Sequence, residues 1–284
     1  RSHQLEQMKK ITTTILILLI FFTGYSQNFT HIGQDSIEYE LKGNGKPWIV
    51  LVHGMGGNMK SFDPIFDSLS KKTTVLRYSR AGLGKSTYNV NEKTFDGIIT
   101  ELEQLLDTLN APDSLILGGN SYAGLMIRAF ATKNPKKVVG LISLDPTFED
   151  YLSVLEKFEP DAKVLESNWI NDNTLKVRID EFESMMSIWT SPKEWKELFD
   201  YSPKIPHFCV SSLLVRDSPL RGTSEIMQAR FDVHSRIIQH SDINMHIGLS
   251  DAGHGVHWAK PQITIDTFIM MLHLVTDANN VYKK

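Results

Sequence analysis

The stretch LGGNSYAG, residues 117–124, sets Ser121 among small residues directly after the apolar run SLIL. A sharp strand-to-helix turn explains this composition, because its apex residue has strained backbone angles and larger side chains two positions away would collide. The pattern is G-x-S-x-G with Ala123 in place of the second glycine, and it predicts that the Ser121 hydroxyl is held away from the sheet as a nucleophile. A serine among glycines also occurs in ordinary turns, so the rest of the chain must supply a base, an acid and an oxyanion site.

Strand patterns alternate with helical patterns along the chain. The strand patterns are SIEYELKG, WIVLVHG, TTVLRYS, SLILGG, VVGLISLD and HFCVSSLLV, and the helical patterns cover residues 95–109, 121–135 and 261–275. Runs that are apolar on both faces are typical of a parallel sheet covered by helices. The sequence therefore predicts an α/β fold with a mostly parallel central sheet and with functional residues where strands end in loops.

One segment breaks this alternation. Residues 147–204 contain helical patches without a clear parallel strand, and they hold three of the five tryptophans. We interpret residues 147–204 as a helical cap inserted between two strands, with residues 27–146 and 205–284 forming the core. The residues predicted to line an apolar substrate pocket are Trp169, Met185, Met186 and Trp189. The alternative is that these side chains pack the cap onto the core.

The N-terminus is predicted to lie outside the fold. Residues 1–26 have the features of an upstream or tag remnant followed by a signal peptide, with two lysines before a 12-residue apolar run at residues 11–22. That run is shorter than the about 20 residues that span a bilayer. Small residues at Gly24 and Ser26 predict cleavage near Gln27, and hence an exported protein, periplasmic or secreted, without a stable membrane anchor. An uncleaved N-terminal anchor is the alternative.

Charge and cysteine content narrow the function. The formal net charge is −3, or about −5 without residues 1–26, and no dense block of lysine and arginine occurs. Nucleic acid is therefore not an expected partner. The single cysteine, Cys209, lies in an apolar stretch, so we expect a buried thiol and no internal disulfide.

Four loops follow predicted strands. HGMGG at residues 53–57 follows WIVLV, and its glycines let backbone N–H groups turn toward a reacting oxygen. The second loop, SRAGLGKS at residues 79–86, follows TVLRY. The third is the serine turn, where the N–H of Tyr122 is a further candidate hydrogen-bond donor to the reacting oxygen. The fourth loop, DAGHGVHWAKP at residues 251–261, holds His254 between two glycines, from which the imidazole can reach the serine.

Taken together, these motifs resemble the α/β-hydrolase superfamily in its capped, esterase-like branch. The matching elements, in order, are H-G-x-G at His53, R-x-G-x-G-x-S at Arg80, the serine turn at Ser121 and G-H-x-x-H at His254. The resemblance spans roughly residues 37–275. The family order Ser…Asp…His implies that Ser121 is the nucleophile and His254 the base.

The chain departs from the family pattern at two positions, and the acid is ambiguous. Ser79 stands where many members have aspartate, which we expect to change structural hydrogen bonds, and Ala123 replaces a glycine. Asp217 follows HFCVSSLLV, where the family usually carries its acid, 37 residues before His254. Asp145 ends VVGLISLD, where some members carry the acid instead. The prediction favours Asp217, with Asp145 as the alternative.

The resemblance implies an exported serine hydrolase that cleaves carboxylic esters, including lactones or macrolide-like cyclic esters, through an acyl-serine intermediate. Backbone N–H groups of Tyr122, Met55 and Gly54 are expected to hold the oxyanion. A small-molecule ester or lactone is the expected partner, with no cofactor and no metal. The alternatives are an amidase or aminopeptidase of the same fold and a catalytically silent ligand-binding protein. The oligomeric state is not predicted.

Rival motifs are weaker. GLGKS resembles the end of a phosphate-binding loop, but that motif requires glycine where Ser79 stands. His254 and His257 with Asp251 could suggest a metal, yet no second ligand cluster has recognisable spacing, and His257 is interpreted as a loop-packing residue. A nucleophilic serine also argues against the dehalogenase and epoxide-hydrolase branches of the fold, which attack with aspartate.

Overall fold

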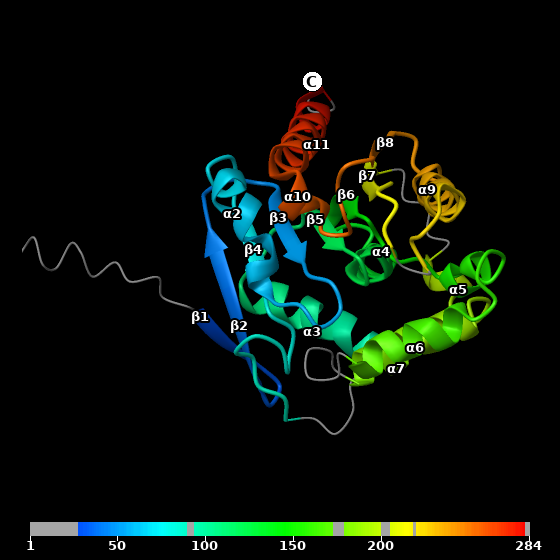
Figure 1. Ribbon diagram of the computed structural model, residues 1–284. Helices are drawn as coiled ribbons and strands as arrows, with labels where there is room; N and C mark the ends of the chain where they lie inside the picture. The colour runs from blue at the N-terminus through cyan, green and yellow to red at the C-terminus, as the bar shows by residue number, and fades with distance from the viewer. Residues whose placement is uncertain (1–27, 90–93, 173–178, 200–204, 218–219, 282–284) are drawn as a thin grey trace, which may run out of the picture.

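Eight strands form one sheet in the order β1-β2-β4-β3-β5-β6-β7-β8 (Figure 1). The computed structural model describes residues 28–89, 94–172, 179–199, 205–217 and 220–281. The strands are β1 (Asn28–Ile32), β2 (Asp35–Lys42), β3 (Trp48–Val52), β4 (Val75–Tyr78), β5 (Leu115–Asn120), β6 (Val138–Leu144), β7 (His207–Ser212) and β8 (Asn244–Leu249). β2 pairs antiparallel with β1 and β4, and all pairs from β4 to β8 are parallel. The predicted mostly parallel sheet is confirmed.

Helices cover both faces of the sheet. The helices outside the connection from β6 to β7 are η1 (Met59–Phe62), α2 (Asp63–Ser70), α3 (Phe95–Thr108), α4 (Ala123–Lys133), α9 (Ser224–Ile238), α10 (Val256–Ala259) and α11 (Pro261–Val281). Successive residues of β3 pack into different cores: Val50 lies in the cluster with α3 and α4, and Leu51 lies in the cluster with α2 and α11. This alternation follows from the two-residue period of a strand and explains why the predicted strands are apolar on both faces.

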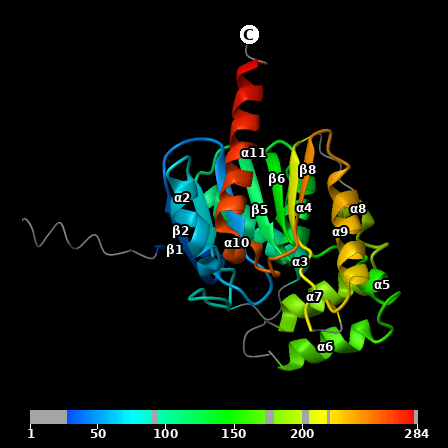
Figure 2. The ribbon, with the colours of Figure 1, turned by 45° about the horizontal axis from the view of Figure 1, so that its top comes forward.

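The connection from β6 to β7 is helical. It contains α5 (Tyr151–Leu155), α6 (Ala162–Asp172), α7 (Ile179–Thr190) and α8 (Lys196–Phe199), and its described residues include no strand. α6 and α7 lie side by side beyond one end of the sheet (Figures 1 and 2). This arrangement is the expected helical cap, and the domain boundaries at residues 147 and 204 stay predictions.

Several elements were predicted and others were not. The helical patterns at residues 95–109, 121–135 and 261–275 correspond to α3, α4 and α11. β1, α2 and α9 were not predicted, because their patterns are short or contain many polar residues. The predicted signal segment, residues 1–26, lies outside the described residues. Within the described ranges, no helix combines the length and the apolar character needed to cross a membrane.

Candidate functional site

Ser121 lies at the turn between β5 and α4, in a left-handed backbone conformation with φ of 57°. The small residues around it are required by packing. A Cβ atom on Gly119 would lie 2.6 Å from Ala123 O, and one on Gly124 would lie 2.4 Å from Pro146 Cβ. The Ser121 hydroxyl has no hydrogen-bond partner among the described residues, and the backbone strain is of the kind stored at functional sites. The predicted serine turn is therefore present.

The pairing of β5 with β6 sets Ser121 beside Asp145. Asn120 is the register partner of Leu144, so the two following residues leave neighbouring strands at the same edge. Ser121 N–H donates to Leu144 O at 3.1 Å, and Thr147 N–H donates to Ser121 O at 2.9 Å. Asp145 also has a left-handed backbone, with φ of 43°. Two strained residues thus stand next to each other at adjacent strand ends.

His254 joins this pair from the loop after β8. Its Nδ1 lies 2.6 Å from Asp145 Oδ2, and Asn120 Nδ2 donates to His254 O at 3.3 Å. The Asp145 side chain is completely buried, whereas the His254 side chain is 39% exposed. The buried carboxylate assigns the proton to Nδ1, which leaves Nε2 free to act as a base.

The structure corrects the preference for Asp217 as the acid. Asp217, the favoured candidate, lies five positions beyond Ser212, the last residue of β7, and is exposed. His254 Nδ1 contacts Asp145 instead, the alternative candidate. The physical reason is that Asp145 follows β6 directly, so its carboxylate starts from the sheet edge that also carries Ser121.

Two arginines that the sequence reading missed surround the Asp145 carboxylate. Arg221 Nη1 lies 3.2 Å and Arg230 Nη2 3.8 Å from Asp145 Oδ2, and Ser212 N–H donates to Asp145 Oδ1 at 3.1 Å. Burial alone would raise the pKa of Asp145, but the hydrogen bond to His254 and the two guanidinium charges outweigh it and hold this pKa well below its usual range. Asp145 is therefore a buried carboxylate that stays ionised.

Arg221 also acts on His254. Its Nη2 lies 3.1 Å from His254 Nδ1, close enough for the guanidinium charge to oppose protonation of the ring. Burial lowers the pKa of His254, Arg221 lowers it further, and Asp145 only partly compensates. The imidazole is therefore neutral, the form that accepts a proton, over a wider range of pH than a free histidine.

The HGMGG loop touches the serine turn. A Cβ atom on Gly54 would lie 3.1 Å from Ser121 Cβ, so the glycine backbone approaches the nucleophile closely. Arg80 donates from Nη1 to His53 O at 2.6 Å and from Nη2 to Gly54 O at 2.9 Å. The N–H groups of Met55 and Tyr122 donate to no acceptor in the described part of the chain. The three predicted oxyanion donors thus come from segments that the structure brings together.

Ser79, where many relatives have aspartate, is supported by a carboxylate from another strand. Ser79 Oγ donates to Glu38 Oε2 at 2.9 Å, and Lys85 N–H donates to the same oxygen at 2.9 Å. Met59 N–H in turn donates to Ser79 Oγ at 3.2 Å. The buried Glu38 of β2 therefore supplies the negative charge in this loop, and the departure affects structural hydrogen bonds.

The cap residues predicted to line a pocket have different surroundings. Trp189 is buried, donates from Nε1 to Phe148 O at 3.1 Å and stacks on Tyr151 with ring centroids 4.6 Å apart. Met185 is also buried, and Met186 is partly buried against the same core. The Trp169 side chain lies outside the description. Trp189 thus packs on other cap residues, and it shares with Met185 a hydrophobic cluster that includes residues of α3 and α4, so substrate binding by these residues stays a prediction.

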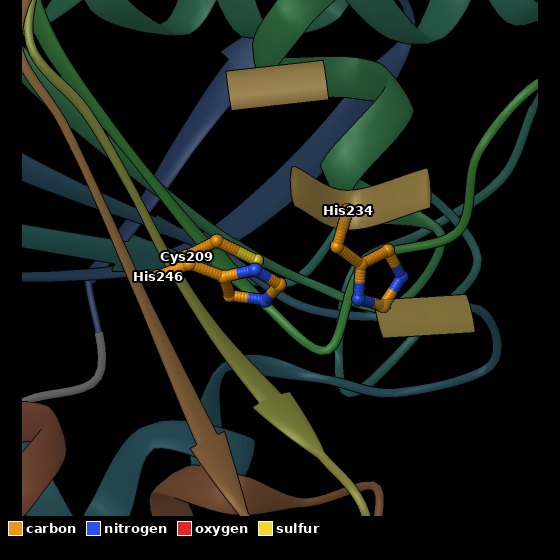
Figure 3. Close-up of side chains that lie close together, drawn as sticks. All are labelled: Cys209, His234 and His246. Carbon is orange, nitrogen blue, oxygen red and sulfur yellow. The ribbon is translucent and has the colours of Figure 1, made fainter. Parts of the chain in front are cut away.

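One group of potential metal ligands occurs among the described residues: Cys209 on β7, His246 on β8 and His234 on α9 (Figure 3). The candidate ligand atoms lie within 4.8 Å of one another. The hydroxyl of Ser211 lies between the two imidazoles, 2.7 Å from His234 Nδ1 and 2.7 Å from His246 Nε2. Burial raises the pKa of the Cys209 thiol to about 12.

The outer nitrogens of these histidines are also hydrogen-bonded. His234 Nε2 lies 2.8 Å from Pro146 O, and His246 Nδ1 lies 2.7 Å from Ser235 Oγ. Each ring nitrogen therefore has a partner, and the contact with Pro146 supports the backbone directly after Asp145. We interpret this group as a buried hydrogen-bond network behind the site.

The other histidine and aspartate of the fourth loop lie apart from the chemistry. His257 is buried and packs its ring on Phe62, with centroids 5.1 Å apart. Asp251 forms an ion pair with Lys260. His257 therefore has the loop-packing position expected from the sequence.

Comparisons with known proteins agree with this fold. The family model described as alpha/beta hydrolase fold matches residues 47–186. An uncharacterized protein of Bacillus subtilis, YqjL, is 24% identical over 223 residues, which cover 78% of this chain and 82% of YqjL. A thermophilic esterase from Thermogutta terrifontis superimposes with a TM-score of 0.60 at 18% identity and covers 88% of this chain and 97% of its own. An enol-lactonase from Burkholderia xenovorans LB400 gives 0.59 at 17% identity, covering 86% and 99%. At such identities the solved structures show the fold alone.

The first prediction tests the acid. Asp145→Asn replaces the Nδ1–H acceptor of His254 by an amide and stabilises the wrong tautomer, so hydrolysis of an activated ester should fall by several orders of magnitude, about 10⁴ in the serine-protease reference case. Asp217→Asn is the matched control and should change turnover less than threefold, as a rough expectation for an exposed side chain. The comparison is made on kcat for p-nitrophenyl butyrate, and the reverse ranking would return the role to Asp217.

The second prediction concerns pH. Because the base must be neutral and the pKa of His254 is lowered, the acidic limb of the kcat/KM profile should lie below the usual histidine value of about 6.5. Arg221→Gln removes a positive charge beside the ring, which raises the pKa of His254 and moves this limb to higher pH. Arg236→Gln, an exposed arginine on the last turn of α9, is the control and should leave the profile in place. An unmoved limb in Arg221→Gln would contradict the assigned electrostatics.

Proposed function

We propose that this chain, which belongs to the α/β-hydrolase superfamily, is a serine hydrolase that cleaves carboxylic esters through an acyl-serine intermediate. The observation that carries the proposal is that Ser121, at a strained turn, and Asp145 follow neighbouring strands, and that Asp145 is hydrogen-bonded to His254. A hydroxyl nucleophile, a neutral base and an ionised orienting acid are the three groups that acyl transfer requires.

In the first half-reaction, Ser121 Oγ attacks the ester carbonyl carbon while His254 Nε2 takes the hydroxyl proton. Asp145 accepts the Nδ1–H hydrogen bond and stabilises the imidazolium without taking the proton itself. The carbonyl oxygen becomes an oxyanion, and backbone N–H groups of Tyr122, Met55 and Gly54 are the proposed donors to it. The C–O bond to the alcohol then breaks, and His254 returns the proton to the departing oxygen.

In the second half-reaction, water replaces the alcohol. His254 removes a proton from water as its oxygen attacks the acyl carbon, the same N–H groups hold the second oxyanion, and the proton returns to Ser121 Oγ as the acid leaves. Both half-reactions use the same base and the same donors. An intact set of these groups supports catalysis over the silent, ligand-binding alternative.

The substrate class is proposed to be an apolar or bulky ester, including cyclic esters. The esterase and the enol-lactonase of the same fold support this class by likeness. Partly buried apolar side chains from both the cap and the core pack against one hydrophobic cluster, among them Met55, Phe182, Met186 and Leu220. Such side chains favour an apolar acyl or alcohol group.

Export is proposed on separate grounds. The lysines, the apolar run at residues 11–22 and the small residues before Gln27 support a signal peptide and a periplasmic or secreted enzyme. A small-molecule ester is then met outside the cytoplasm.

The third prediction tests the nucleophile. Ser121→Ala should abolish nearly all hydrolysis of p-nitrophenyl butyrate and all labelling by a fluorophosphonate probe, because no other group attacks the carbonyl. The change removes one oxygen at a partly exposed turn, so the melting temperature should stay near that of the wild type. More than a few per cent residual activity in pure, folded protein would remove Ser121 from the mechanism, and a wild type that never reacts with the probe would favour a ligand-binding protein.

The fourth prediction tests the substrate class. Burying one methylene group is worth about 0.8 kcal/mol, so each added carbon of a fitting acyl chain should raise kcat/KM roughly fourfold until the binding surface is filled. A series of p-nitrophenyl esters from acetate to octanoate, with a macrolactone beside it, measures this. Met186→Ala should flatten the rise, whereas Val164→Ala, an exposed residue of α6, should leave it unchanged. A series in which acetate is the best substrate would instead indicate a deacetylase-like enzyme.

A further inference from the structure

A buried ion pair connects the cap to the loop after β4. Arg80 Nε lies 2.6 Å from Glu181 Oε1, and the two side chains are 0% and 1% exposed. Arg80 follows β4 and Glu181 is on α7, so the partners are 101 residues apart in sequence. Their mutual attraction raises the pKa of Arg80 although burial alone would lower it. Removing two charged side chains from water costs free energy, and a hydrophobic pair is often as stable. The other contacts of Arg80 and Glu181 therefore indicate what this ion pair does.

Both Arg80 and Glu181 also form hydrogen bonds with the backbone of the HGMGG loop. Glu181 uses its second oxygen, Oε2, to accept the N–H of Gly56 at 3.1 Å. Arg80 uses its two terminal nitrogens to bind His53 O and Gly54 O. Backbone groups of three loop residues, His53, Gly54 and Gly56, are therefore held by one pair of side chains, and one member of that pair belongs to the cap.

His53 completes the same arrangement. Its Nδ1 lies 2.8 Å from Gly54 O, and its Nε2 lies 3.3 Å from the N–H of Arg80. Burial and the charge of Arg80 lower the pKa of His53 well below its usual range, so the ring is neutral. A neutral ring with the proton on Nδ1 donates to Gly54 O and accepts from Arg80 N–H, which satisfies both nitrogens.

These contacts fix the direction of the oxyanion donors. In a planar trans peptide the C=O and the following N–H point in opposite directions. Holding His53 O on Arg80 therefore directs the Gly54 N–H away from Arg80, and holding Gly54 O does the same for the Met55 N–H. The Gly54 backbone is also the part of the loop that meets Ser121.

We propose that Glu181 is a positioning residue for the oxyanion donors, so that docking of helix α7 of the cap sets the geometry of transition-state stabilisation. This inference rests on the proposed function, since it needs an oxyanion formed at Ser121. Glu181 acts through Arg80 and Gly56 rather than on the substrate, because both of its oxygens are already occupied by these donors.

Glu181→Gln tests this with little change in shape. Glutamine offers one acceptor oxygen and one NH₂ group, but Glu181 faces two N–H donors, so one of the two contacts must be lost. Misplacement of a donor should lower kcat about 10- to 100-fold. KM should change less than about threefold, because ground-state binding does not use the oxyanion. Glu183→Gln, on the exposed side of the same helix, is the matched control and should keep the wild-type kcat.

An alkyl trifluoromethyl ketone separates positioning from a purely structural role. Its hemiketal with Ser121 carries a negative oxygen, so its affinity should fall in Glu181→Gln by the same factor as kcat. Hydrogen–deuterium exchange of residues 53–57 provides a readout without catalysis, and the Gly56 amide should lose protection. A cap that merely holds the pocket together would instead raise KM and leave both kcat and the protection of the Gly56 amide at their wild-type values.

A second variant guards against loss of folding. Because an unpaired buried charge destabilises a protein and a hydrophobic replacement of both partners is often tolerated, the double change Arg80→Met with Glu181→Met should stay folded while losing the three side-chain contacts to the loop. Its kcat should fall at least as far as that of Glu181→Gln. Full kcat in either folded variant, a change confined to KM, or an equal loss in Glu183→Gln would overturn the inference. Failure of the proposed function is seen separately, as ester hydrolysis that survives Ser121→Ala.

Discussion

The pairing of β5 with β6 is the constraint on which the site depends. Their register brings Ser121 and Asp145 off adjacent strands at one edge, and both residues take left-handed backbone conformations there. Such strain persists only where the surroundings over-determine it. Here Thr147 N–H donates to Ser121 O, and Pro146 lies so close to Gly124 that a Cβ atom on residue 124 would clash with it. Ser121 and Asp145, the proposed nucleophile and acid, are thus held next to each other by contacts that do not involve the histidine loop.

Charge distribution divides the site into two parts. Behind His254, Arg221 and Arg230 surround a single carboxylate, so Asp145 stays ionised and the imidazole resists protonation. In the HGMGG loop, the charge of Arg80 is neutralised by Glu181, and Arg80 donates hydrogen bonds to the backbone carbonyls of His53 and Gly54. In the proposed mechanism, the first group of charges tunes the pKa of the base, and the second positions the backbone N–H groups that face the developing negative charge.

The sequence predicted most of this, and its failures have physical causes. Most strands, the serine turn and the position of His254 follow from local patterns, because apolar periodicity and small residues report backbone geometry directly. The acid does not, since Asp145 and Asp217 both follow strands and only tertiary packing decides which carboxylate reaches the imidazole. A usable signal was the position of Asp145 directly after its strand, as for Ser121. The pairing of Arg80 with Glu181 carries no local pattern, because the partners are 101 residues apart.

The triad candidates and the candidate oxyanion donors are held by different parts of the fold. Ser121 and Asp145 lie at ends of neighbouring parallel strands, and Asn120 binds the histidine loop to the same edge. The oxyanion donors sit on a glycine-rich loop whose backbone is held partly by a residue of the cap. Cap sequences are the part of such a fold in which substrate preference changes, since the cap covers the site from a separate insertion. In the proposed mechanism, a substitution that moves α7 to admit a new substrate also moves the donors, so specificity and rate change independently only where the contact between Arg80 and Glu181 is kept.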